Sequence, residues 1–274
     1  MMKFKKWKIK KAVFIGILTF ATSVFAEKED YGFVVVNATL PHYLGSNEYY
    51  GVTFPFPLAL SQKQTWHDEY KSTFYLDFDA NLRLPIGGAD ITDSAPENIT
   101  DEDARVISNT TNYARRGMGY LPPAGYLGAK AGLNIGQIRL ETAITPGIQL
   151  GHDWESAGVL SRVTLSWTPL LKNSGTNSYM LRFMAEAQYG DKTYHNMYYG
   201  VSAEHAIAGR SEFDGKKSGY TGYFLGIELA KRFGPIVAGA SAGYYNMDGS
   251  IVEESPLVVT KSNFGTGFML GYVF

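Results

Sequence analysis

The sequence lacks cysteine altogether. This absence excludes a disulfide-stapled scaffold, a thiol nucleophile and cysteine-ligated zinc or iron–sulfur sites. Charged residues are also scarce, at 19%. Beyond residue 26, no apolar run approaches the roughly 20 residues that a transmembrane helix needs. The chain instead contains 30 glycines, 14% aromatic and 45% hydrophobic residues, a composition too apolar for a disordered chain.

The first 26 residues have the pattern of a secretory signal peptide. Six lysines and no acid precede an uncharged stretch of 15 residues, which ends Ser23-Val24-Phe25-Ala26. A basic start, an apolar middle and small residues before the cleavage point are typical of such signals. We therefore predict a signal peptide over 1–26 and one domain over 27–274. That domain has 19 basic and 26 acidic residues, a net charge of −7, which argues against a nucleic-acid partner.

Apolar residues alternate with small or polar ones over long stretches. At the end of the chain, the alternating residues with the larger, mostly aromatic side chains are Phe264, Thr266, Phe268, Leu270, Tyr272 and Phe274. The same period of two recurs from Ser72 to Leu84. A soluble sandwich also alternates, but long strands in this number and a final aromatic residue favour a membrane barrel. We predict an all-β, transmembrane antiparallel β-barrel located in the bacterial outer membrane.

Ten strands are expected, over 31–40, 51–60, 71–84, 124–134, 137–150, 158–170, 178–189, 219–231, 236–246 and 262–274. The connections alternate between short and long, and 85–123 and 190–218 are the longest. In such barrels the short turns face the periplasm, so the long loops are expected outside the cell. An alternative with 12 strands needs 193–201 and part of 247–261 as further strands.

Charged residues are expected to line the lumen. The inward positions carry five acids and five bases: Asp77, Asp79, Arg83, Lys130, Arg139, Glu141, Arg162, Arg182, Glu186 and Glu228. Charges inside a narrow tube are tolerated when they are paired or hydrated. The balance favours a self-neutralised interior, and the alternatives are a narrow pore or a site for a small polar ligand.

The sequence offers only weak candidates for a catalytic or metal-binding site. His152, Asp153 and Ser156 bring a base, an acid and a hydroxyl together in a short loop, which keeps a barrel hydrolase as a minor hypothesis. Acidic residues gather in 89–112, but their spacing fits a solvated loop better than a calcium site. We predict no enzyme activity, no catalytic residue, no metal and no cofactor.

Several short motifs resemble the MipA/OmpV family of outer-membrane proteins. They are the stretch with Pro41, Tyr43, Gly45 and Ser46; Pro55 and Pro57; Arg115, Arg116, Gly117 and Met118; Tyr194, His195 and Tyr199; Ser255, Pro256 and Leu257; and the terminal Phe274. They follow the family's order along nearly the whole exported chain. The resemblance implies no catalytic residues.

The resemblance implies a barrel that, in some members, acts as a scaffold between a murein-degrading transglycosylase and a murein-synthesising penicillin-binding protein. A non-enzymatic scaffold is therefore the preferred function. The alternatives are a narrow pore for small solutes and an adhesin or receptor that contacts host or matrix surfaces through 85–123 and 190–218. Outer-membrane lipid and lipopolysaccharide are expected around the barrel in every case.

Overall fold

The computed structural model describes residues 30–41, 44–46, 49–60, 73–83, 124–150, 155–172 and 177–274. The predicted signal peptide and the loop 85–123, with its acidic run, lie outside the described residues.

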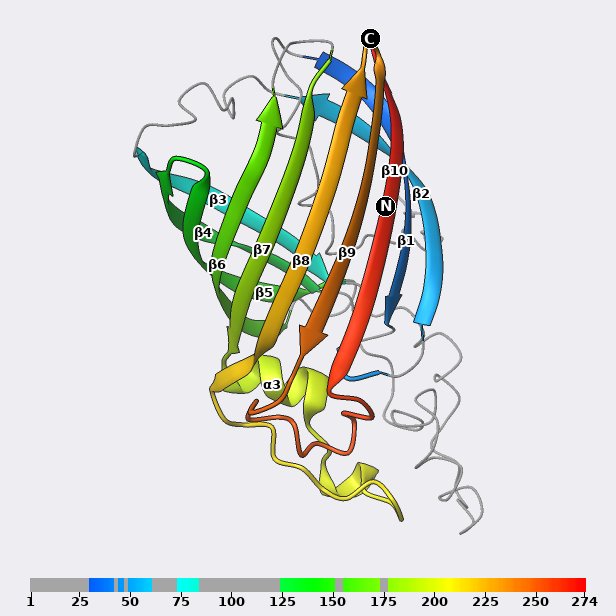
Figure 1. Cartoon of the computed structure of the whole chain (residues 1–274). Coiled ribbons are helices and arrows are strands. Elements are labelled where there is room, and N and C mark those ends of the chain that lie inside the picture. Colours follow the sequence, from blue (N-terminus) through cyan, green and yellow to red (C-terminus); the bar gives the residue numbers. More distant parts are fainter. Residues whose placement is uncertain are drawn as a thin grey trace, which may run out of the picture.

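Ten antiparallel strands form one sheet that curls into a barrel (Figure 1). They are β1 (Asp30–Pro41), β2 (Tyr49–Leu60), β3 (Thr73–Arg83), β4 (Ala124–Ile135), β5 (Ile138–Gln149), β6 (Ser156–Lys172), β7 (Tyr179–Gly190), β8 (Gly219–Phe233), β9 (Ile236–Asn246) and β10 (Ser262–Val273). From β3 to β10 each strand pairs with the next in sequence, β10 pairs with β1, and β1 pairs with β2. The two ends of the sheet are β2 and β3, and no pairing joins them within the described residues.

The predicted fold class is confirmed, and each predicted strand boundary is within two residues of the observed one. The alternative with 12 strands is wrong. The segment Lys192–Tyr199 forms a helix, α3, and residues 247–261 form turns. The loop 190–218 is therefore partly helical, because Asp191 caps α3 and the aromatic residues within it recur four apart on one helical face.

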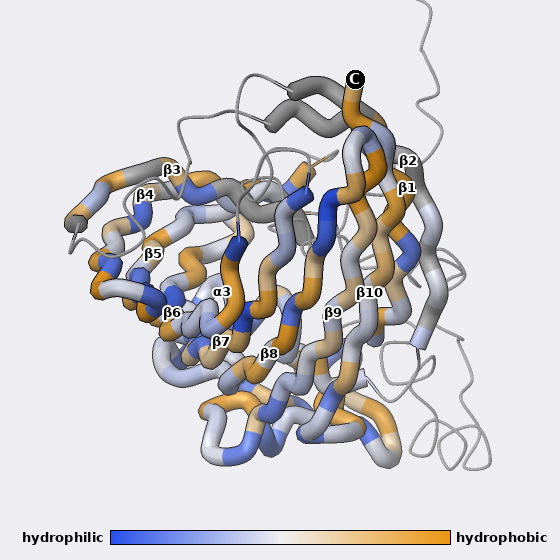
Figure 2. Tube along the Cα trace, turned by 45° about the horizontal axis from the view of Figure 1, so that its top comes forward, coloured by the Kyte–Doolittle hydropathy of each residue, from blue (hydrophilic) through white to orange (hydrophobic). Residues whose placement is uncertain are grey.

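The two faces of the sheet differ in polarity. On β3, Phe78 is 81% exposed, whereas the neighbouring Asp79 is 5% exposed. Figure 2 shows hydrophobic and hydrophilic positions interleaved along the strands. Because successive side chains point to opposite faces, one face is apolar and outward and the other faces the interior. This is the opposite arrangement to that of a soluble protein and matches a barrel surrounded by lipid.

Aromatic pairs lie on the outward face near both ends of the barrel. At one end, the rings of Trp167 and Phe183 stack with centroids 5.7 Å apart, and Phe33 lies 6.4 Å from Phe274. At the other end, Tyr244 lies 4.9 Å from Phe264. Aromatic girdles at the two membrane interfaces are characteristic of outer-membrane barrels.

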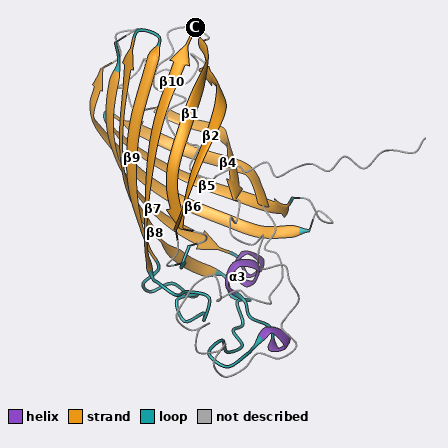
Figure 3. Cartoon of the chain, turned by 90° about the vertical axis from the view of Figure 1, so that its right-hand side faces the viewer, coloured by secondary structure: helices purple, strands orange, loops and turns teal. Residues whose placement is uncertain are grey.

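The two ends of the barrel are built differently (Figure 3). At the end called here the turn end, β1 begins, β10 ends, and two-residue turns join β4 to β5 and β8 to β9. The opposite, capped end carries α3, the short 3-10 helix η2 (Ala203–His205) and the segment 247–261. No helix in the described part of the chain is long and apolar enough to cross a membrane.

Candidate functional site

A tyrosine-rich core closes the capped end. One face of α3 contributes Tyr194, Tyr198 and Tyr199, which are all buried. They pack against the inward Tyr126 of β4 and Tyr245 of β9 in one hydrophobic cluster. Tyr126 Oη donates to the Ala157 carbonyl at 3.0 Å. The stretch from Tyr194 to Tyr199 is therefore part of a packed cap across the mouth of the barrel.

The start of α3 sits directly on β6 at Gly158. Asp191 caps the helix by accepting a hydrogen bond of 2.8 Å from the Tyr194 N–H. Gly158 has φ +81°, and a Cβ added there would lie 2.2 Å from the Tyr194 nitrogen. Glycine at 158 is needed both for this left-handed backbone and for the close approach of the helix.

His195 is fully buried beneath the cap. Its Nδ1 lies 2.7 Å from the Lys217 carbonyl oxygen, and its Nε2 lies 2.9 Å from Thr221 Oγ1. A carbonyl only accepts, so Nδ1 carries the proton and Nε2 accepts from the Thr221 hydroxyl. Burial lowers the pKa of His195, against the opposing effects of the Lys217 carbonyl and the Asp191 charge. The histidine is therefore a neutral structural link between α3 and β8.

Three of the sequence motifs meet in the cap although they are far apart along the chain. Ser255 Oγ donates to the Tyr199 carbonyl at 2.6 Å, and Leu257 is buried against Val201. The Gly45 carbonyl accepts from the Val259 and Thr260 N–H groups at 2.8 and 2.9 Å. Asn263 of β10 then joins the Gly45 N–H and the Ser46 carbonyl. The motifs therefore build one structure that ties the β1–β2 connection to α3.

The remaining motif residues lie elsewhere in the fold or outside the described residues. Pro41 ends β1, Pro55 and Pro57 lie within the edge strand β2, and Phe274 is exposed at the turn end. Tyr43 and the stretch from Arg115 to Met118 lie outside the described residues.

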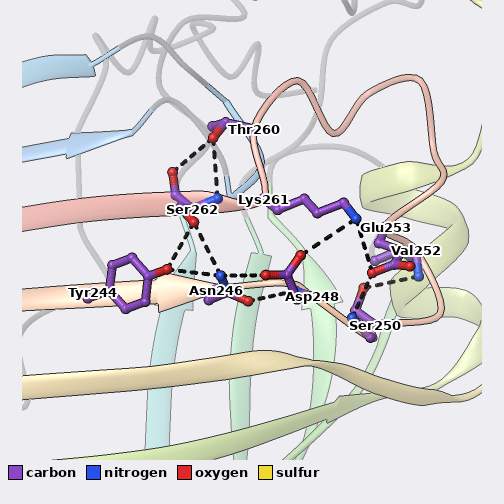
Figure 4. Close-up of polar contacts among 10 residues, drawn as sticks. Tyr244, Asn246, Asp248, Ser250, Val252, Glu253, Thr260, Lys261 and Ser262 are labelled. Atoms are coloured by element: carbon purple, nitrogen blue, oxygen red, sulfur yellow. Dashed lines mark hydrogen bonds and ion pairs between the residues drawn. The ribbon is translucent and has the colours of Figure 1, made fainter.

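A polar network holds the segment 247–261 where it leaves β9 and enters β10 (Figure 4). Asn246 Nδ2 donates to Tyr244 Oη at 2.9 Å and to Asp248 Oδ2 at 3.1 Å. Lys261 Nζ lies 3.5 Å from a carboxylate oxygen of both Asp248 and Glu253. Asn246 is buried, whereas Lys261 and Asp248 are well exposed, so we assign the network a role in shaping this loop.

Inside the barrel, charged side chains reach across the interior to strands that are not neighbours. Arg162 on β6 pairs with Asp79 on β3, although β4 and β5 separate these strands in the sheet. Glu186 on β7 lies 3.9 Å from the same guanidinium and accepts from Thr164 and Gln188 at 2.8 and 2.7 Å. Arg162 thus bridges two carboxylates.

A second set lies nearer the turn end. Tyr75 Oη donates to Glu141 Oε1 at 2.5 Å. The Tyr75 ring covers Gly132, where a Cβ would lie 2.2 Å from Cζ of that ring. Arg139 donates to Asn134 at 2.8 Å and lies 5.7 Å from the Tyr75 ring centroid.

Arg182 and Glu228 form a further interior pair, with 3.4 Å between Nη1 and Oε2. Glu228 is 3% exposed. Among the buried polar atoms of the described residues, Arg162 Nε and Glu228 Oε1 lack a hydrogen-bond partner. Pairing is therefore extensive but incomplete. Of the remaining sequence-predicted charges, Lys130 is half-buried, and the side chains of Asp77 and Arg83 lie outside the described residues.

Apolar side chains lie on the turn-end side of these charges. Met180, Ala230, Val237 and Val273 form a buried cluster on β7 to β10. The charged layer therefore lies between this cluster and the tyrosine core of the cap.

Sequence reasoning left the stretch from Tyr194 to Tyr199 open between an exposed anchor and a lid over the barrel mouth, and it did not predict the helix. Its signals were present: Asp191 is a good N-cap residue, and the aromatic residues of α3 recur at helical spacing. His152 and Asp153, the minor hydrolase hypothesis, lie outside the described residues. Within the described part of the chain, no group of His, Asp or Glu residues is arranged to hold a metal ion.

An antiparallel sheet curled into a barrel, apolar and aromatic outside and charged inside, defines an outer-membrane β-barrel protein. The family model described as "MltA-interacting protein MipA" matches residues 35–274. The chain belongs to this family, and the resemblance seen in the sequence is confirmed.

Among solved structures, the chain is similar to "Crystal structure of the outer membrane protein OprG from Pseudomonas aeruginosa", with 9% identity and a TM-score of 0.24. The match covers 92% of this chain and 98% of that chain. Comparison with curated proteins gave no match.

Proposed function

We propose that this protein is a non-enzymatic barrel whose mouth is covered by the cap and which works through contacts at its ends. At the turn end it docks a murein-degrading transglycosylase. The single observation that carries this proposal is the packed cap over a charge-paired interior. A side-chain core that seals a barrel mouth gives stability and a fixed surface, and it leaves little room for a wide aqueous path. The family description, which names an MltA-interacting protein, supports the choice of partner.

The size of the turn end sets a condition on this docking. Gln137 and the Gly234-Pro235 turn project little beyond the strands, since each of these two connections has only two residues. A standard protein interface buries about 800 Å² on each partner. Several turns must therefore contribute together, and no single turn is expected to be sufficient.

Site-specific photo-cross-linking tests the proposal. A photoreactive residue is placed at Gln137 or Asn177 of the turn end, and a control is placed at Ser211 of the capped end; all three are exposed. We expect a cross-link to a murein transglycosylase in intact envelopes from the turn end only. A folded barrel whose turn-end probes never capture this enzyme, in envelopes that contain it, contradicts the scaffold role.

A second candidate function is an external adhesin or receptor. It is favoured by the segment 202–218, which displays exposed Glu204, Glu212 and Lys216 on the cap. Replacing 203–212 with a short glycine–serine linker should reduce attachment of whole cells to matrix-coated surfaces. Unchanged attachment, with normal surface levels of the protein, contradicts this candidate.

A further inference from the structure

Two lysines stand out on the lipid-facing side of the barrel. Over the described strands β4 to β10, the outward positions are apolar, aromatic or uncharged, except for Lys172 and Lys231. Both side chains are exposed, and neither has a carboxylate partner among the described residues. A lysine on the lipid face is strongly disfavoured at the membrane midplane and tolerated near the interface. Lys172 and Lys231 therefore mark the level of the lipid headgroups on the outward face.

The strand register places the two lysines in one row. Lys172 of β6 lies directly opposite Tyr179 of β7, and Tyr179 lies directly opposite Lys231 of β8. Residues that are directly opposite share a face, with Cβ atoms roughly 5 Å apart. The two lysines therefore flank Tyr179 on the outward face, and all three side chains carry a hydrogen-bond donor.

The row lies near the turn-end edge of the apolar belt, where Phe233 of β8 and Ile236 of β9 are the next exposed outward residues. Lys172 is the last residue of β6, and Tyr179 is the first of β7. The next outward residues toward the middle of the strands, Leu170 and Leu229, are exposed and apolar. The Lys231 Nζ lies 4.3 Å from the centroid of the Phe233 ring. This cation–π contact holds Lys231, at one end of the row, against the aromatic girdle.

We propose that this row binds the phosphate of an anionic glycerophospholipid, whose acyl chains lie along Leu170, Leu229 and neighbouring apolar side chains. Ammonium groups are strong phosphate ligands, and the paired positive charge favours a headgroup with net negative charge. A soluble peptide is disfavoured because apolar residues continue directly below the row. In outer-membrane barrels the short turns face the periplasm, so the lipid belongs to the periplasmic leaflet.

Lipid retention tests the site. The full-length exported chain is refolded in vesicles of phosphatidylcholine with one-tenth phosphatidylglycerol and extracted in mild detergent, and the co-purified lipids are counted by native mass spectrometry. We expect the ratio of retained phosphatidylglycerol to phosphatidylcholine to exceed the ratio in the vesicle on the order of ten-fold at low salt. The K172Q/K231Q variant should lose this enrichment, and K172R/K231R should keep it.

The matched control removes the same charge elsewhere. K192Q/K216Q changes two exposed lysines of the capped end and should retain the enrichment. Equal enrichment in the wild type and in K172Q/K231Q, with both folded by their heat-dependent gel shift, overturns the proposal. Inorganic phosphate should displace the lipid no better than chloride of equal ionic strength. Stronger displacement by phosphate assigns the row to the free anion and also overturns it.

Discussion

At the residue scale, the interior depends on charges that neutralise one another. Glu228 is almost completely buried and faces Arg182, and Asp79 and Glu186 share Arg162. Removing one member of a buried pair leaves the other charge in a low-dielectric environment, and this cost exceeds the lost attraction. Such residues are expected to affect stability more than any specific activity.

The variant E228Q should lower the free energy of unfolding by about 3 kcal/mol, because the guanidinium of Arg182 stays buried without its counter-charge. Urea unfolding of the refolded barrel, followed by tryptophan fluorescence, measures this change. The double variant R182Q/E228Q should recover part of the loss. E204Q is the control, because Glu204 is well exposed. An E228Q barrel as stable as E204Q means that the pair is not buried in solution.

At the element scale, α3 depends on its seat on β6. G158A introduces a Cβ against the Tyr194 nitrogen and keeps a strained φ, so the helix must shift. Gly136 also has a positive φ, +57°, but has open space around it. G136A should therefore show only the backbone cost of roughly 1–2 kcal/mol, and G158A should cost more. Hydrogen exchange of the α3 amides should also rise in G158A alone. Equal effects in the two variants would argue against the close seat.

The same helix should loosen in acid. The folded-state pKa of His195 is lowered by burial, so the unfolded cap binds the proton more readily. The cap is then fully stable above the unfolded value of about 6.5, and stability is lost as the pH falls through that value toward the folded-state pKa. Limited proteolysis of residues 191–218 at pH 7.5 and pH 5 measures this. H195N has no titrating ring and should show no such pH dependence; a dependence that persists in H195N places its origin elsewhere.

At the scale of the whole molecule, the outward face must tolerate lipid and reject charge. Leu165 lies outward in the middle of β6 and is half exposed. L165R should destabilise the barrel by about 2–4 kcal/mol in vesicles, because the guanidinium enters the hydrocarbon core. K172R, at the edge of the belt, should be neutral. Equal stability of L165R and the wild type in vesicles would contradict the orientation of the sheet.

The sequence alone determined the strands, their faces and the class of protein. A period of two is a local property, since alternation along Phe264 to Phe274 records directly which side chains meet lipid. The strand limits followed from the same pattern. The local signals of α3 were present but were outweighed by the assumption that a long connection is a loop.

Tertiary structure decided what lies at the ends and in the interior. Gly45, Tyr199 and Ser255 are far apart in sequence, and only the closure of β1 on β10 brings them into one cap. The partners of Arg162 likewise depend on the curl of the sheet, which carries β3 toward β6 across the interior. The row Lys172, Tyr179 and Lys231 exists only in the register of three strands. Periodicity specifies which face a residue occupies, whereas its neighbours on that face depend on register and curvature, which are set by contacts between distant segments.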